Sequence, residues 1–175
     1  MALSNFSLPL IPKSKPRVFP KLVATLTPPR SLKSNLSHEM LLFSASPTVA
    51  EIGALAGYDV VVVDLEHGPG SVSEALHCNR AVKAAGSSSV IRVQEVTSAW
   101  AKKAMDVEPN GVMFPKIENA KEAEYAVSLC CYPPDRVCGC AYNLVKVSDF
   151  GLPQTYLQDF KERLLIMSQV LILHI

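Results

Sequence analysis

The chain has 175 residues, and its 17 Lys and Arg residues nearly balance its 16 Asp and Glu residues, which gives a net charge of +1. This length suffices for one domain with a buried core. The near-neutral charge argues against a broad nucleic-acid-binding surface. No apolar run reaches the roughly 18–20 residues that a membrane-spanning helix needs. The longest run, residues 164–175, contains Ser168 and Gln169 and predicts a buried strand.

Residues 1–38 differ from the rest of the chain, because they contain six prolines and no acidic residue. Their basic residues are Lys13, Lys15, Arg17, Lys21, Arg30 and Lys33. A basic, Ser-rich and acid-poor composition is typical of an organellar transit peptide. We therefore expect residues 1–30 to be a leader that directs the protein to the chloroplast, and residues 31–175 to form the domain. The alternative is a disordered tail on a cytoplasmic protein.

Beyond the leader, apolar runs that favour strands alternate with patterns that favour helices. The expected strands are residues 40–44, 59–64, 88–93, 111–115 and 164–173, and the expected helices are 48–56, 71–85, 98–106, 120–131 and 154–163. Thr48 with Glu51, and Ser71 with Glu74, have the spacing of a capping box at a helix N-terminus. Strands and helices that alternate in this way predict an α/β fold with a parallel sheet.

The second expected strand carries four consecutive valines and ends in ionisable side chains. Asp64, Glu66 and His67 come just before a Gly-Pro-Gly turn at residues 68–70. An unbroken β-branched run is typical of a strand covered on both faces. In parallel α/β proteins the ligand site lies beyond the carboxyl ends of the strands. We therefore predict an acid–base site at this strand end.

Arg92 and Lys116 follow two later strands in the same way. A site assembled from several strand ends is typical of the (β/α)8 barrel, which needs about 200–250 residues. With only five expected strands, the chain predicts a partial (β/α)8 TIM barrel of about five βα units that does not close. The glycine motifs of dinucleotide-binding and P-loop proteins are both missing from the sequence.

Four stretches, in order, resemble the HpcH/HpaI aldolase family, which also has citrate lyase-type relatives. They are residues 50–70 with the Asp-Leu-Glu-His segment, Val90-Ile-Arg-Val93, residues 105–120 with Gly-Val-Met-Phe-Pro-Lys, and residues 132–139. The resemblance extends roughly from Ser31 to Gln169.

This resemblance implies reversible, metal-dependent cleavage of a carbon–carbon bond beside a 2-keto acid. The products would be pyruvate, or a related keto acid, and an aldehyde. It also implies a divalent Mg or Mn ion and a homo-oligomer. His67 would be the acid–base catalyst, and Arg92 would bind the keto acid and stabilise its enolate. Asp64 or Asp106 would orient His67, and Gln169 would contact the substrate.

One position departs from the family pattern. The family's metal-binding glutamate falls where this chain has Leu171, and leucine offers no oxygen to a hard cation. A second ligand, an aspartate, belongs to a strand beyond the five expected here. We therefore expect a C-terminally truncated aldolase domain whose metal ligand is lost. The alternative is a non-catalytic fragment that pairs with full-length subunits or is unstable. A third interpretation is citrate lyase-type chemistry on an acyl-CoA, for which we identify no basic anion site.

Overall fold

The computed structural model describes residues 37–131 and 164–170. Its strands are β1 (Glu39–Leu42), β2 (Val60–Asp64), β3 (Ser88–Arg92), β4 (Gly111–Ile117) and β5 (Leu165–Val170). Its helices are α1 (Pro47–Leu55), α2 (Val72–Ala84), α3 (Ser98–Asp106) and α4 (Ala120–Leu129). The expected leader, the expected helix at 154–163, the stretch at 132–139 and Leu171 lie outside the described residues.

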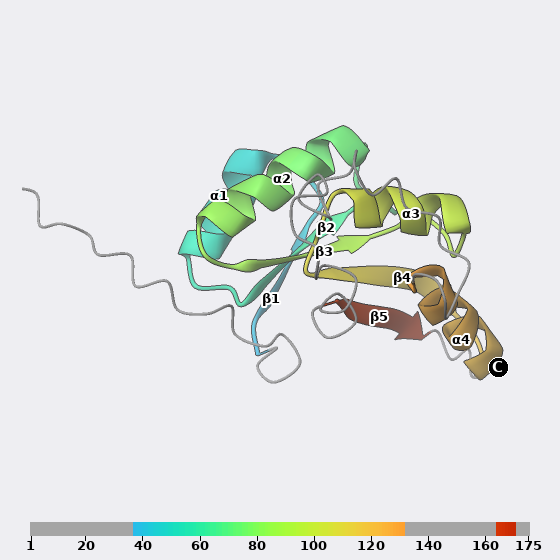
Figure 1. The fold of residues 1–175 in the computed structure, drawn as a ribbon. Helices are drawn as coiled ribbons and strands as arrows, with labels where there is room; N and C mark the ends of the chain where they lie inside the picture. The colour runs from blue at the N-terminus through green and yellow to red at the C-terminus, as the bar shows by residue number, and fades with distance from the viewer. Residues whose placement is uncertain (1–36, 132–163, 171–175) are drawn as a thin grey trace, which may run out of the picture.

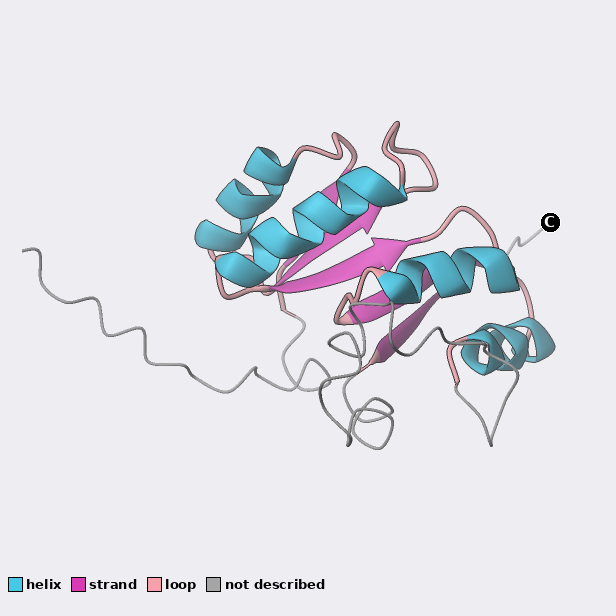
Figure 2. Cartoon of the chain, turned by 45° about the horizontal axis from the view of Figure 1, so that its top comes forward, coloured by secondary structure: helices cyan, strands magenta, loops and turns pink. Residues whose placement is uncertain are grey.

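The five strands form one parallel sheet in the order β1-β2-β3-β4-β5. Helices α1, α2 and α3 lie along one face of this sheet, and α4 follows β4 (Figures 1 and 2). In the described part of the chain, β1 and β5 are the two edges of the sheet, which does not close. The structure thus confirms the expected α/β class with an open parallel sheet.

The two faces of the sheet are packed differently, because successive strand residues point to opposite sides. Val61, Val63 and Ile91 belong to a large buried cluster with the helices. Val60 and Val62 belong to a smaller cluster on the other face, with Val90 and the half-buried side chains of Met113, Leu165 and Met167. Asp64 and Arg92 follow the same alternation as Val62 and Val90, so they project from this inner face.

The N-termini of two helices test the capping predictions, and one prediction is wrong and the other is confirmed. The N-cap of α1 is Ser46 rather than Thr48, and the Ser46 hydroxyl accepts a hydrogen bond from Val49 N at 3.5 Å. The reason is Pro47, whose fixed φ suits the first position of a helix. Ser71 caps α2 as expected, and Glu74 completes the capping box.

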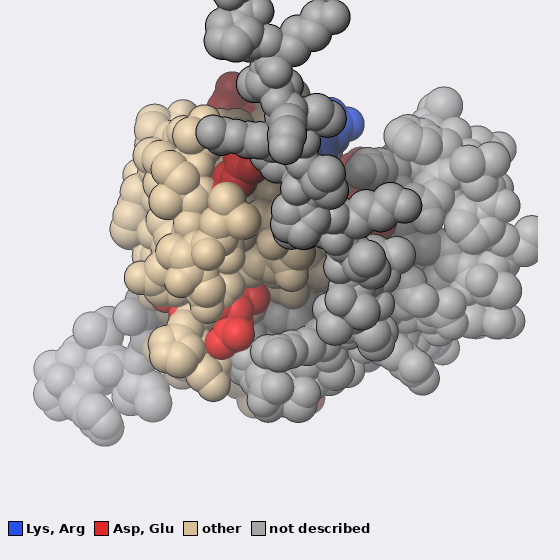
Figure 3. Space-filling view, turned by 90° about the vertical axis from the view of Figure 1, so that its left-hand side faces the viewer, with Lys and Arg blue, Asp and Glu red and all other residues tan. Residues whose placement is uncertain are grey.

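Within residues 37–131 and 164–170, no helix combines the length and the apolar character needed to cross a membrane. The described face on the β1 and α1 side presents mostly uncharged residues, with a few acidic side chains among them (Figure 3). Along α1 the exposed apolar side chains are Val49, Ile52 and Leu55.

Candidate active site

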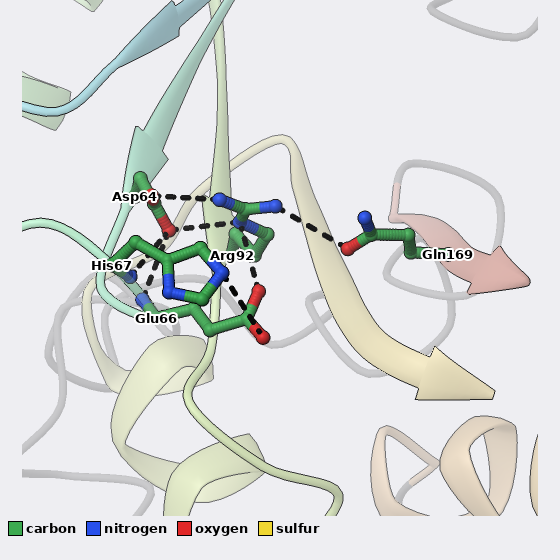
Figure 4. Close-up of polar contacts among 5 residues, drawn as sticks. All are labelled: Asp64, Glu66, His67, Arg92 and Gln169. Atoms are coloured by element: carbon green, nitrogen blue, oxygen red, sulfur yellow. Dashed lines mark hydrogen bonds and ion pairs between the residues drawn. The ribbon is translucent and has the colours of Figure 1, made fainter. Parts of the chain in front are cut away.

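Three strands bring polar side chains together at their carboxyl ends. Asp64 is the last residue of β2, Arg92 is the last residue of β3, and the two stand opposite each other in the sheet register. Gln169 comes from β5 and approaches Arg92 from the other side (Figure 4). Since parallel strands all end at the same edge, the polar strand ends predicted from the sequence meet here, apart from Lys116, for which the structure gives no polar contact to this group.

Asp64 and Arg92 form a two-point ion pair. The Asp64 oxygens accept hydrogen bonds from Arg92 Nε at 2.8 Å and from Arg92 Nη2 at 2.7 Å. Asp64 is fully buried and Arg92 is 6% exposed. A planar guanidinium matches a carboxylate in this geometry, which makes the contact strong and directional. The pair therefore fixes the orientation of Arg92 at the edge of the sheet.

The surroundings of the pair set its charge states. Burial alone would raise the pKa of Asp64, but the Arg92 hydrogen bonds, the backbone N–H groups of Glu66 and His67, and the Arg92 charge lower it below its ordinary value. The hydrogen bond to Asp64 raises the pKa of Arg92. Both groups are therefore charged at neutral pH.

Gln169 extends the cluster toward β5. Its Oε1 accepts a hydrogen bond from Arg92 Nη1 at 3.3 Å. Arg92 has five N–H donors, and three of them go to Asp64 and Gln169. Within the part of the chain that the structure describes, one N–H on each terminal nitrogen remains without a hydrogen-bond partner. Arg92 and Gln169 also line a cavity of about 360 Å³, with Val62, Met113 and Met167 among its apolar walls.

His67 lies beside this cluster, but its partner is not the one predicted. Its imidazole is 65% exposed, and Nε2 lies 3.6 Å from Glu66 Oε1. Asp64 instead accepts a 3.4 Å hydrogen bond from the His67 backbone N–H. The predicted contact between Asp64 and the His67 ring is therefore wrong in this structure, because the Asp64 oxygens are engaged by Arg92 and the turn.

Asp106 is the last residue of α3, as expected, and the structure gives no polar contact between Asp106 and His67. Helix α3 runs back from the carboxyl edge to the edge where β4 begins, as the connection between parallel strands requires. There Asn110 N donates to Ser89 O, at the start of β3, at 2.9 Å. The described residues therefore give no support to the prediction that Asp106 orients His67, which stays a prediction. Burial raises the pKa of Asp106, and Lys102 opposes this rise.

The sequence of the described strands matches that of a known protein family. The model of the HpcH/HpaI aldolase/citrate lyase family matches residues 39–170. This chain belongs to the HpcH/HpaI aldolase/citrate lyase family. The match includes all five strands and every residue of the cluster, so the predicted family is confirmed.

Individual family members agree with this assignment. A 2-keto-3-deoxy-L-rhamnonate aldolase of Salmonella gallinarum (strain 287/91 / NCTC 13346) is 30% identical over 129 residues, which are 74% of this chain and 48% of the relative. A solved HpcH/HpaI aldolase/citrate lyase family protein from Burkholderia cenocepacia J2315 has a TM-score of 0.71 and 33% identity, over 75% of this chain and 53% of that one.

An HpcH/HpaI aldolase from Desulfitobacterium hafniense DCB-2 has a TM-score of 0.66 and 27% identity, over 75% of this chain and 51% of that one. The chain spans about half the length of the relatives it matches. The open five-stranded sheet is thus the fold of the matching part of these barrel-type HpcH/HpaI proteins, which confirms the predicted partial barrel.

The donor set for the family's divalent ion does not fit here. Among residues 37–131 and 164–170, no group of three or more His, Cys, Asp or Glu side chains could hold a metal ion. Asp64 is already paired with Arg92. Leu171, at the family's glutamate position, lies outside the described residues and carries no oxygen on its side chain.

The structure adds a detail to each of two residues that the sequence had already singled out. Glu66, which the sequence places in the acid–base cluster, contacts both His67 and Arg92, and its double contact could not be read from the Asp-x-Glu-His segment alone. Lys116 sits in a β-bulge of β4 with a φ of 51°, in the left-handed region that non-glycine residues rarely adopt. Bulges of this kind often redirect a side chain next to an active site.

Proposed function

We propose that this HpcH/HpaI domain serves as a carbon–carbon lyase of the aldolase class, acting on a 2-keto-3-deoxy acid to give pyruvate, or a related keto acid, and an aldehyde. The observation that carries the proposal is the buried Asp64–Arg92 pair, which leaves N–H donors of Arg92 at the carboxyl edge beside His67. The 2-keto-3-deoxy-L-rhamnonate aldolases among the relatives support the substrate class.

In the proposed cleavage, a base removes the proton of the hydroxyl group at C4 of the substrate. The C3–C4 bond breaks, the oxygen at C4 becomes the aldehyde carbonyl, and the bonding electrons pass into the enolate of the keto acid. His67 takes the hydroxyl proton, a task for which imidazole is suited near neutral pH. Arg92 donates hydrogen bonds to the enolate oxygen, which carries the developing negative charge. A proton then returns to C3 to complete pyruvate.

This mechanism is tested by assaying the purified chain for pyruvate release from 2-keto-3-deoxy-L-rhamnonate, with Mg²⁺ or Mn²⁺ and with a chelator. We expect His67→Ala to lower turnover by about 10²–10⁴-fold, which is the usual contribution of a general acid–base group. We expect Leu171→Glu, which adds an oxygen ligand, to make pyruvate release respond to Mg²⁺ or Mn²⁺. Turnover that His67→Ala leaves unchanged contradicts the proposed role of His67.

A second candidate is a non-catalytic chain that pairs with other subunits of the family. It is favoured by the two open sheet edges in the described region, because unpaired strand edges are templates for another strand. Leu41 on β1 and Val170 on β5 are 40% and 57% exposed. This candidate predicts no turnover in either the unmodified chain or Leu171→Glu, together with co-elution with a full-length relative in size-exclusion chromatography.

A further inference from the structure

Glu66 stands between the two functional side chains of the site. Its Oε1 lies 3.6 Å from His67 Nε2, and its Oε2 lies 3.4 Å from Arg92 Nε. The Glu66 side chain is 10% exposed, whereas that of His67 is 65% exposed. The close-up shows the carboxylate reaching toward both neighbours (Figure 4). Glu66 is therefore the carboxylate that faces the imidazole.

Asp64 does not compete for this role. Its two oxygens accept hydrogen bonds from two Arg92 nitrogens and from two backbone N–H groups of the turn. The Nε–H of Arg92 points to Asp64 at 2.8 Å, so it gives Glu66 an ionic contact but no hydrogen bond. Among the buried side-chain oxygens and nitrogens of the described residues, only Glu66 Oε2 has no hydrogen-bond partner.

A buried carboxylate oxygen without a hydrogen bond costs stability, so it calls for an explanation other than stability. The charges supply one. Asp64 already neutralises Arg92, and Glu66 adds a second negative charge to the same cluster. With His67 uncharged, the three ionised groups sum to −1. This excess opposes the binding of an anionic keto acid at Arg92.

We propose that Glu66 is a positioning residue, which holds the His67 imidazole at the site and balances the charge that His67 acquires when it takes a proton, at the cost of weaker anion binding by Arg92. The inference rests on the proposed aldolase function. It predicts that loss of the Glu66 charge acts in opposite directions on binding and on turnover. A purely structural role would weaken both.

The binding arm uses oxalate, a planar analogue of the pyruvate enolate, in isothermal titration calorimetry. We expect Glu66→Gln to bind oxalate about tenfold more tightly than the unmodified chain, because a unit charge this close to the anion is removed. Glu51→Gln, which removes an exposed charge on α1, is the matched control and should leave the affinity within about twofold, because a distant exposed charge is screened. The NMR signal of the His67 ring should move in Glu66→Gln and stay in place in Glu51→Gln.

The activity arm uses the assay for pyruvate release. We expect Glu66→Gln to lower kcat by about tenfold or more, as misplacing a catalytic group does, while KM for the keto acid falls. Circular dichroism establishes folding, and Glu66→Met replaces Glu66→Gln if the latter does not fold. If Glu66→Gln, or Glu66→Met in its place, binds oxalate as tightly as the unmodified chain or more weakly, the proposed role of Glu66 is wrong, while the proposed function still stands. Failure of oxalate to bind any variant overturns the proposed function as well.

Discussion

The Asp64–Arg92 contact shows why the site uses arginine at the end of β3. A guanidinium offers its Nε and Nη2 donors to one carboxylate and keeps further N–H groups for a second anion, which a lysine ammonium does not do in a fixed geometry. The pair is buried, with side-chain exposures of 7% for Arg92 and 0% for Asp64. The fold needs both partners of the pair, because removing either one leaves the other charge buried without this ion-pair contact.

This pair gives a prediction about stability and pH. We expect Asp64→Asn to lower the free energy of unfolding at pH 7 by about 3–5 kcal/mol, because buried Arg92 then loses its two hydrogen bonds to a carboxylate and keeps only the ionic contact with Glu66. Because the folded-state pKa of Asp64 is lowered, the stabilisation is complete above about pH 4 and is lost as the pH falls through the folded-state value. Urea unfolding between pH 7 and pH 3 measures both effects. A variant as stable as the unmodified chain at pH 7 would contradict the first.

At the residue scale, the sequence predicts which residues belong to the site but not which side chains contact each other. Asp64, Arg92 and His67 could be identified because each follows a predicted strand end. Which acid faces which base could not, because Asp64 and Arg92 are 28 residues apart and the turn alone decides whether Asp64 or Glu66 reaches His67. Sequence spacing does not specify those side-chain directions.

At the scale of elements, the turn after β2 places His67 by packing against the loop after β1. A Cβ added at Gly68 would collide with the carbonyl oxygen of Asp64 and lie 2.9 Å from that of Phe43. A Cβ at Gly70 would collide with Ala45, which has a φ of 51°. The Gly-Pro-Gly sequence therefore serves a close approach of two loops, and this approach fixes the path of residues 65–70.

Gly68→Ala tests this packing. We expect the variant to lose about 1–3 kcal/mol of unfolding free energy, the usual cost of overpacking, and to shift the NMR signals of Glu66 and His67. The matched control is Gly57→Ala, where a Cβ meets nothing within 4 Å but φ is +97°. Its backbone strain should cost stability without moving the His67 signals. Equal perturbation of His67 by both variants would argue against a specific role of the turn.

The elements themselves were largely predictable, because their patterns are local. The valine run of β2, the capping box of α2 and the alternation of strands and helices each specify nearby backbone. Strand β4 was expected to end at Pro115 but continues to Ile117 through the bulge at Lys116. A bulge depends on pairing with β5, about 50 residues away, so a local pattern does not reveal it.

At the scale of the whole molecule, the described sheet is the part of a barrel that five parallel strands form, and it does not close. Its inner face carries Val62, Met113 and Met167 beside Arg92 around a cavity, and its edges β1 and β5 are unpaired in the described region. The chemistry of the site comes from β2, β3 and β5, so it does not depend on closure for its geometry. The donors for a divalent ion are the part of the family's site that the described residues do not supply.

In the proposed function, Arg92 presents its remaining N–H groups to a keto acid. The most direct measurement is the Arg92 Nε–H signal in a ¹⁵N NMR spectrum of the purified chain, assigned with Arg92→Lys and followed during a pyruvate titration with and without Mg²⁺. We predict a saturable shift of this signal, with a smaller response from the exposed Arg80 side chain as internal control. An Arg92 signal that stays fixed while pyruvate reaches millimolar excess would contradict the binding of a keto acid by Arg92.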